Sequence, residues 1–307
     1  MKKLIFNILV VSFIFSSLSM YAQGLKVATY NIRNENSGDA SNGNGWAQRC
    51  PVICQMIQFH DFDIFGAQEV LHGQLLNMLS ALPEYGYIGV GRDDGKENGE
   101  YSPVFYKTKK FKLLQSGHFW MSAVTDIPNK GWDAALPRIC TWGKFLDRKS
   151  GISFWFFNLH MDHIGVEARK QSTLLVLKTI KEKCGNQPVI LTGDFNVDQN
   201  NESYSLLNHS GILTDSYDLT KIRYALNGTF NNFDANLKTD SRIDHIFVTS
   251  KWKVLRYGVL TDSYRSATEN GKEVNSTNFP KEVSLQLYLV RLPSDHFPVE
   301  VELKYAK

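Results

Sequence analysis

The chain contains six short apolar segments with the residue types of buried β-strands. They combine β-branched and aromatic residues and are bounded by polar or turn-forming residues. They lie at residues 25–31, 63–70, 152–160, 188–194, 242–249 and 297–303. Two other stretches have helical spacing: residues 52–57, and residues 166–184, which end before Gly185. Strands with interspersed helices predict a layered α/β sandwich.

The pattern shows no internal repeat, no low-complexity tract and no linker that would separate two domains. We therefore expect a single domain over residues 23–307. One segment, residues 263–291, departs from the pattern because it is polar at its start and apolar at its end. We interpret it as a long loop with an extra strand.

The first 22 residues have the three regions of a secretory signal. Lys2 and Lys3 precede an apolar run over residues 4–15, and serines follow it. The run is too short to span a bilayer. We expect cleavage after Ala22, export to the periplasm or the medium, and no membrane insertion after cleavage.

Composition excludes several classes of protein. Of the 307 residues, 43% are hydrophobic and 21% are charged, which excludes disorder. Residues 1–22 contain two lysines and no acid, so their removal leaves a net charge of +1, which indicates no acidic partner. Cys50 and Cys54 are four residues apart on a predicted helix, a geometry that suits a disulfide poorly. We expect mostly buried thiols and no zinc-finger site.

Polar side chains stand where the predicted strands end. They are Asn31, Glu69, His160, Asp194 with Asn196, Asp244, and Asp295 with His296. Each one alone has an ordinary explanation as a turn or cap residue. Because sheet layers bring strand ends to a common rim, six such ends together predict one pocket.

The chemistry of these side chains indicates a hard divalent cation. The set contains carboxylates, amides and two histidines but no cysteine. Oxygen ligands of this kind suit Mg²⁺, Mn²⁺ or Ca²⁺ better than zinc. Mg²⁺, or Mn²⁺ in its place, is the expected cofactor, and it points to phosphoryl chemistry.

Four motifs carry a resemblance to a known family. They are NIR at 31–33, QEV at 68–70, GDFN at 193–196 and SDHFPV at 294–299. In order and spacing they resemble the endonuclease/exonuclease/phosphatase superfamily, and within it the DNase I-like branch, over residues 25–303. The resemblance implies an α+β fold, a four-layer α/β/β/α sandwich of two mainly antiparallel β-sheets.

The resemblance also implies a metal site and a water site. Asn31 and Glu69 would lie at the metal, Glu69 as a direct ligand, with Asp295 on or close to the ion. Asp194 would orient or deprotonate the attacking water. Asn196 would donate a hydrogen bond to a phosphate oxygen.

Two histidine–carboxylate pairs follow from the same resemblance. His296 would be held by Asp244 and His160 by Glu100, while Arg138 matches a phosphate-contacting arginine. A carboxylate on the far nitrogen fixes a histidine's tautomer and stabilises its charged form, as a general acid or base requires. Which histidine is the acid stays open.

Departures from the family pattern narrow the substrate. The abasic-site repair branch carries an acid where this chain has Arg33, which argues against that activity. The insertion at 263–291 precedes Asp295 and His296 and can wall off the cleft, which argues against long duplex DNA as substrate.

Weaker candidates have two readings each. Trp46 and Arg49 fit either a substrate contact or a surface loop with a helix start. Arg169 fits either a phosphate contact or a solvated helix face. Asp162 and His163 fit either the active rim or a strand cap.

We therefore expect an exported, divalent-metal-dependent phosphoesterase that hydrolyses phosphodiesters with water activated by metal and histidine. Its substrate would be a nucleic acid or a phosphorylated lipid or glycan, and the protein would be a monomer. One alternative is a non-catalytic module that binds a phosphorylated ligand. Another is a zinc hydrolase of the metallo-β-lactamase type, suggested by HMDHIG at 160–165 but lacking a histidine at Asn158.

Overall fold

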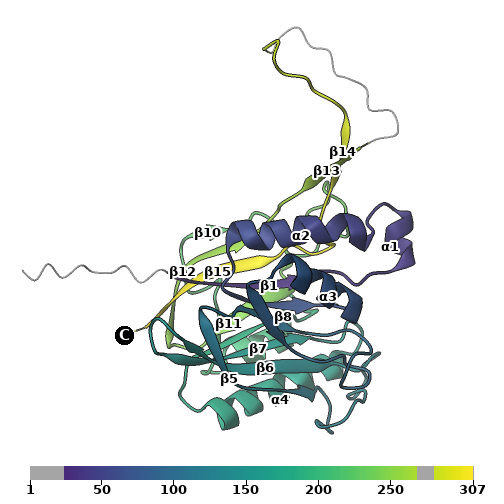
Figure 1. Ribbon diagram of the computed structural model, residues 1–307. Helices are drawn as coiled ribbons and strands as arrows, with labels where there is room; N and C mark the ends of the chain where they lie inside the picture. Colours follow the sequence, from purple (N-terminus) through teal and green to yellow (C-terminus); the bar gives the residue numbers. More distant parts are fainter. Residues whose placement is uncertain (1–23, 268–279, 307) are drawn as a thin grey trace, which may run out of the picture.

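The computed structural model describes residues 24–267 and 280–306, and two sheets form its centre (Figure 1). The first has the order β10-β12-β15-β1-β2-β4-β3, and the second β5-β6-β7-β8-β11-β9. The strands of the first sheet are β1 (Leu25–Asn31), β2 (Ile64–Gln68), β3 (Tyr85–Ile88), β4 (Val104–Lys107), β10 (Arg223–Tyr224), β12 (Trp252–Val259) and β15 (Val299–Tyr305). Those of the second are β5 (Phe111–Trp120), β6 (Ile139–Asp147), β7 (Ser153–His160), β8 (Val189–Asp194), β9 (Thr214–Asp215) and β11 (Asp244–Val248).

Helices cover the outer face of each sheet. They are α2 (Trp46–His60), α3 (His72–Ala81), α4 (Val166–Cys184) and α5 (Glu202–Asn208), while the short α1 (Ser37–Ser41) buries none of its residues. Figure 1 shows α2 and α3 above the first sheet and α4 below the second. Three apolar clusters fill the spaces between the four layers, one between the sheets and one under each helical layer. The fold is thus the expected α+β four-layer sandwich, and most strand pairs are antiparallel.

The periodic segments of the sequence form the elements expected of them. Strand β1 and helix α4 have the predicted bounds, and β2, β7, β8, β11 and β15 lie within two residues of theirs. The helical spacing at 52–57 belongs to the longer helix α2. Cys54, Cys140 and Cys184 are buried free thiols and Cys50 is a half-buried one, as expected.

The insertion forms a small sheet of its own. Strands β13 (Tyr264–Ala267) and β14 (Tyr288–Arg291) pair antiparallel, so the expected extra strand is one of two. Arg291 Nη1 donates to the Asn42 carbonyl (2.8 Å) and the Asn44 Oδ1 (3.1 Å), which ties the base of the hairpin to the loop after α1. In Figure 1 the hairpin extends away from the body beyond α2. Residues 268–279, and the predicted signal at 1–22, lie outside the described residues.

Strand registry brings the polar strand ends together. Parallel pairing sets Asn31 of β1 beside Gln68 of β2, and His160 of β7 beside Asp194 of β8. Antiparallel pairing sets Asp244 at the start of β11 opposite Asp194. The predicted convergence on one rim therefore follows from the order of strands within the sheets.

A buried polar bridge joins the two sheets below this rim. The Asn158 amide donates to the carbonyls of Ala67 (2.7 Å) and Pro103 (2.9 Å). Its oxygen accepts from Gln68 Nε2 (2.7 Å) and Thr192 Oγ1 (3.0 Å). All four hydrogen-bonding positions of this buried amide are satisfied, so the bridge fixes the relative position of β2 and β7.

Within the described residues, no helix combines the length and the apolar character needed to cross a membrane.

Candidate active site

Asp194 is the centre of the cluster at the strand ends. Its Oδ2 accepts from Asn31 Nδ2 (2.9 Å) and lies 3.6 Å from His160 Nε2 and 3.8 Å from His296 Nε2. Its Oδ1 accepts from the backbone N–H of Asn196 (2.9 Å), which is possible because Asn196 has a left-handed backbone (φ 50°). Burial, together with the neighbouring Asp244, raises the pKa of Asp194 to about 7.

The expected pair of His296 with Asp244 is formed. His296 Nδ1 lies 2.9 Å from Asp244 Oδ2, and both side chains are buried. Burial lowers the pKa of His296, but the carboxylates of Asp244 and Asp194 outweigh it and hold that pKa well above its usual value. His296 therefore carries a proton at neutral pH.

The expected pair of His160 with Glu100 is not a hydrogen bond. Glu100 Oε2 is 3.9 Å from His160 Nδ1, because Arg92 Nη1 binds that oxygen at 2.6 Å. Asn34 Nδ2 donates to the other oxygen of Glu100 (3.0 Å). Burial, with the charges of Arg138 and Arg92, holds the pKa of His160 well below its usual value. The two histidines thus differ in charge.

Asn31, Glu69 and Asp295, the predicted cation residues, are all neighbours of Arg33, whose backbone N–H donates to Asn31 Oδ1 (2.9 Å). Asn31 Nδ2 donates to Glu69 Oε1 (2.9 Å) as well as to Asp194. The guanidinium of Arg33 lies 3.9 Å from Glu69 Oε2 and 3.6 Å from Asp295 Oδ2. Burial raises the pKa of Asp295, and the charge of Glu69 adds to this effect while His296 opposes it.

These residues fit a divalent cation. The donor atoms are carboxylate and amide oxygens, the hard ligands that Mg²⁺ and Mn²⁺ prefer. Arg33 approaches both carboxylates, so positive charge is already favoured between them. Two groups of side chains have potential ligand atoms within 4.8 Å of one another: Glu69, His160 and Asp194 in one, and Asp194, Asp244 and His296 in the other.

Arg138, the predicted phosphate contact, directly precedes β6 and is buried. Its Nε binds Asp162 Oδ2 (3.2 Å) and its Nη2 lies 2.9 Å from His163 Nδ1. Its Nη1 is buried without a hydrogen-bond partner among the described residues, and so is the Nε of Arg92. Buried donors without a partner are rare, and a phosphate oxygen would satisfy them.

Three of the weaker candidates form hydrogen bonds within the protein. Arg49 is fully buried and donates to the carbonyls of Ile32, Arg33, Asn44 and Pro293, so it fixes loops and is not open to substrate. Trp46 is buried and donates to Asn77. Arg169 donates to the Asp162 carbonyl (2.9 Å), and therefore supports the loop that holds Arg138.

Three residues at the site were not among the sequence candidates. Arg92 and Asn34 bind Glu100, and Phe230 packs its ring edge on His296 with 5.2 Å between ring centroids. Phe230 remains 41% exposed. None belongs to a motif, although Asn34 follows NIR directly and a search of residues flanking that motif would have found it.

Comparisons with known proteins agree with this geometry. The sequence profile of the endonuclease/exonuclease/phosphatase family matches residues 28–296. The structure is similar to the mannosyl-6-phosphatase of Bacteroides thetaiotaomicron VPI-5482, with 55% identity, a TM-score of 0.85, and coverage of 92% of this chain and all of the other. A family member from Bacteroides vulgatus has 37% identity, a TM-score of 0.78, and coverage of 92% and 99%.

A curated protein of Acanthamoeba polyphaga mimivirus, itself uncharacterized, is 27% identical over 277 residues, which cover 83% of this chain and 91% of that protein. The family profile spans most of the chain. The two similar structures match it over nearly their whole lengths. The chain belongs to the endonuclease/exonuclease/phosphatase family and is a metal-dependent phosphoester hydrolase.

Proposed function

We propose that the protein is a divalent-metal-dependent phosphatase that removes phosphate from position 6 of a mannosyl group. The observation that carries the proposal is the 55% identity to a mannosyl-6-phosphatase along that protein's whole solved chain. The buried site supports it, because its unpartnered arginine donors suit the several free oxygens of a phosphate monoester. This proposal replaces the phosphodiester hydrolysis expected from the sequence with hydrolysis of a phosphate monoester.

The side chains have distinct roles in this proposal. Burial raises the pKa of Asp194 to about 7, so this carboxylate can take the proton of an attacking water near neutral pH. His296, held in its charged form by Asp244, donates to a phosphate oxygen. Asn196, whose Nδ2 lies 3.2 Å from His160 Nε2, donates to another phosphate oxygen.

In this proposal two groups of residues contact the phosphate. Arg138 and Arg92 offer the unpartnered donors, and neutral His160 lies between them and Asp194. Asn31, Glu69 and Asp295 would hold the cation, preferably Mg²⁺ or Mn²⁺. That ion supplies positive charge for the phosphate oxygens and for the oxygen that departs.

Phe230 offers an apolar surface beside the catalytic residues. Its ring packs against His296 and is partly exposed, so one side of the sugar can rest on it. An aromatic ring next to the reacting phosphate favours a substrate with a ring of its own close to the ester. This contact further supports a sugar phosphate.

Hydrolysis of a small panel of substrates tests the proposal, measured as inorganic phosphate for the sugar phosphates, as p-nitrophenol for the bis ester and as strand cleavage for the plasmid. The panel is mannose 6-phosphate, glucose 6-phosphate, bis(p-nitrophenyl) phosphate and plasmid DNA, with Mg²⁺, Mn²⁺ or EDTA. We expect mannose 6-phosphate to be the best substrate and EDTA to abolish turnover, with Asp194→Asn as the inactive control. Faster cleavage of either phosphodiester would overturn the assignment.

Membership of this family argues against both alternative functions that the sequence left open. A zinc hydrolase of the metallo-β-lactamase type is excluded because the chain has another fold, in which Asn158 joins the two sheets. A module without catalytic activity is at odds with a family of hydrolases. The resemblance also allows a nucleic acid substrate, and plasmid DNA in the panel tests it.

Export remains part of the proposal. The charged, apolar and serine-rich regions of residues 1–22 support a signal that is removed on secretion. N-terminal sequencing of protein recovered from the periplasm or medium tests it, with Gln23 as the expected first residue. Recovery of full-length chain from the cytoplasm would contradict it.

A further inference from the structure

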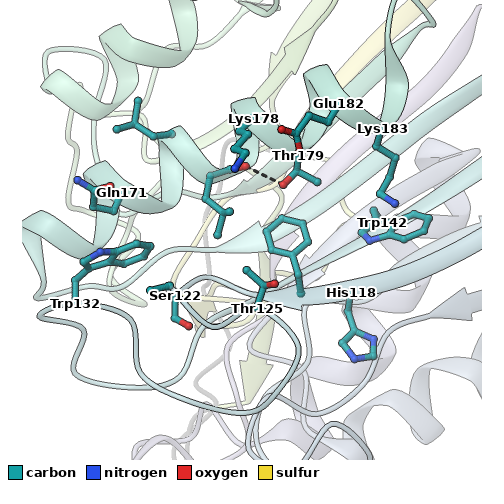
Figure 2. Close-up of a pocket in the computed structure, with 14 residues that line it drawn as sticks. His118, Ser122, Thr125, Trp132, Trp142, Gln171, Lys178, Thr179, Glu182 and Lys183 are labelled. Atoms are coloured by element: carbon teal, nitrogen blue, oxygen red, sulfur yellow. Dashed lines mark hydrogen bonds between the residues drawn. The ribbon is translucent and has the colours of Figure 1, made fainter.

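A groove of about 660 Å³ lies on the outer side of the second sheet, away from the catalytic residues. Helix α4 forms one wall, the ends of β5 and β6 form the floor, and the loop of residues 121–137 forms the other wall (Figure 2). Its size falls within the range of ligand-binding pockets. None of the catalytic or metal candidates lines it.

The groove has the lining of a carbohydrate site. Figure 2 shows Trp132 at one end beside Gln171, and Trp142 at the other beside Lys183. Phe119 and Leu175 also line the groove and add apolar surface. The polar and charged side chains that line it are His118, Ser122, Thr125, Gln171, Lys178, Thr179, Glu182 and Lys183. Aromatic faces with hydroxyl, amide and charged neighbours of both signs suit the apolar faces and hydroxyl groups of sugar rings.

Trp132 is the residue most clearly placed for a ligand. Its side chain is 41% exposed, and no other ring or cation stacks on it within the part of the chain that the structure describes. Its backbone is left-handed (φ 52°), which is unfavourable for a bulky residue. By contrast, the Lys183 ammonium already covers the Trp142 ring at 4.1 Å.

Neighbouring contacts hold Trp132 in this position. The next residue, Asp133, accepts from the backbone N–H groups of Glu167 (3.2 Å) and Ala168 (2.6 Å) in the first turn of α4. These bonds satisfy helix N–H groups that have no partner within the helix. The indole is therefore held at the mouth of the groove by the start of the helix.

The groove and the phosphate site share their supporting elements. The loop that carries Trp132 ends at Arg138, six residues later, and the Met121 N–H donates to the Arg138 carbonyl (2.8 Å). Asp162 binds Arg138 and its carbonyl accepts from Arg169, on the first turns of α4. Trp142 is four residues beyond Arg138, or roughly 13 Å in an extended strand. A short oligosaccharide can span that distance.

We propose that this groove binds the oligosaccharide portion of a phosphorylated glycan, with the Trp132 indole stacked on one of its sugar rings. The proposal rests on the proposed phosphatase function and extends it, because the substrate becomes a phosphorylated mannose at the end of a longer chain. The near balance of charge in the groove, two lysines against one glutamate, disfavours nucleic acid as the occupant.

Kinetics on two substrates test the groove separately from the catalytic site. The substrates are mannose 6-phosphate and a mannose oligosaccharide with a terminal 6-phosphate. For Trp132→Ala we expect kcat/KM to fall about tenfold on the oligosaccharide, through KM, and to stay unchanged on the monosaccharide. Trp132→Phe should recover part of the loss. Tyr224→Ala, which removes an exposed aromatic ring from β10, is the matched control and should change neither value.

Equal losses on both substrates, or no loss on either, would overturn the groove proposal and leave the phosphatase proposal standing. If the wild type hydrolyses neither sugar phosphate, the phosphatase proposal fails, and calorimetry with an unphosphorylated mannose oligosaccharide still tests the groove. Binding by the wild type and its loss in Trp132→Ala supports the groove. Absence of binding by the wild type overturns it.

Discussion

At the scale of single residues, the two histidines of the site show how surroundings decide charge. Both are buried beside Asp194 at similar distances. His296 has Asp244 on its far nitrogen, whereas the carboxylate near His160 is bound by Arg92. Burial lowers the pKa of both histidines. Nearby carboxylates outweigh it at His296 and raise that pKa, whereas nearby arginines lower the pKa of His160 further. One charged and one neutral imidazole therefore face the same carboxylate.

Removal of the central groups should abolish turnover without unfolding the chain. For Asp194→Ala and His296→Ala we expect kcat to fall about 10²–10⁴-fold each, the usual contribution of a positioned acid or base. Phosphate release measures the loss, and circular dichroism checks the fold. His209→Ala, an exposed histidine on α5's C-terminal cap, is the control. Retained activity in both active-site variants would contradict the catalytic roles assigned to Asp194 and His296.

A buried ion cluster away from the site should make stability depend on pH. Asp215 contacts Arg242 Nη1 (3.0 Å), His245 Nδ1 (3.3 Å) and the Tyr204 hydroxyl (2.9 Å). Burial raises the pKa of Asp215, but His245 and Arg242 outweigh it and lower that pKa below its usual value. A lowered pKa in the folded state stabilises it above the unfolded-state pKa of about 3.9, and that stability is lost as pH falls through the folded-state pKa.

For Asp215→Asn we expect a loss of about 3–5 kcal/mol in the free energy of unfolding at pH 7, because the buried arginine loses its partner. The variant's stability should also fall less than that of the wild type below about pH 4. Urea unfolding between pH 3 and pH 7 measures both. Asp218→Asn, a nearby exposed side chain that accepts from Asn208, should change little. An equal acid dependence in Asp215→Asn and the wild type would contradict the pKa account.

At the scale of elements, contact between strands sets the site as much as the residues on it. Gly66 of β2 lies where the second sheet approaches the first. A Cβ atom there would be 2.2 Å from the Asn158 oxygen and 2.4 Å from Thr192 Oγ1. Only glycine lets the Asn158 bridge reach β2. The strand that ends beside Glu69 is therefore positioned by a residue without a side chain.

Gly66→Ala should destabilise the protein by about 1–3 kcal/mol, since the added methyl group overpacks the bridge. We also expect lower kcat, because β2 carries the segment that ends at Glu69. Gly73→Ala in α3 is the matched control, since nothing lies within 4 Å of its added Cβ. That control should be neutral or stabilising by up to about 1 kcal/mol. Equal unfolding free energies for the two variants would contradict the role of the bridge.

At the scale of the whole molecule, the four layers bring together the charged residues that we propose as the cation site. Glu69 and Asp295 come from distant parts of the chain and approach the same arginine. Burial raises the pKa of Asp295 and the charge of Glu69 adds to this effect, so positive charge near the two carboxylates is favourable. A cation that binds only the folded state would stabilise it by mass action.

Metal removal should therefore lower both activity and stability. We expect EDTA to abolish phosphate release, and Mg²⁺ at about 100 times its Kd to add about 2.7 kcal/mol to the free energy of unfolding. Glu69→Gln should raise the Mg²⁺ concentration needed for half-maximal activity, while Glu97→Gln, an exposed acid, should not. Thermal unfolding with and without Mg²⁺ measures the stability. A melting temperature that does not change when Mg²⁺ is added would contradict the proposed cation site.

The sequence alone determined the layered fold class, six of the strands, α4 and the polar residues that meet at the strand ends. Those features are local, because strand and helix periodicity and the polar residue after each strand can be read from neighbouring positions. The other sheet strands, such as β5 and β12, have alternating or mixed burial and gave no comparable signal.

Tertiary structure decided the pairings. Arg49 binds the carbonyl of Pro293, which is 244 positions away, and Arg92 takes the carboxylate that was expected to bind His160. The groove with Trp132 exists only because α4 packs beside the loop of residues 121–137. Hydrogen bonds and ion pairs between distant segments depend on how the layers stack, and no periodicity within one segment records that stacking.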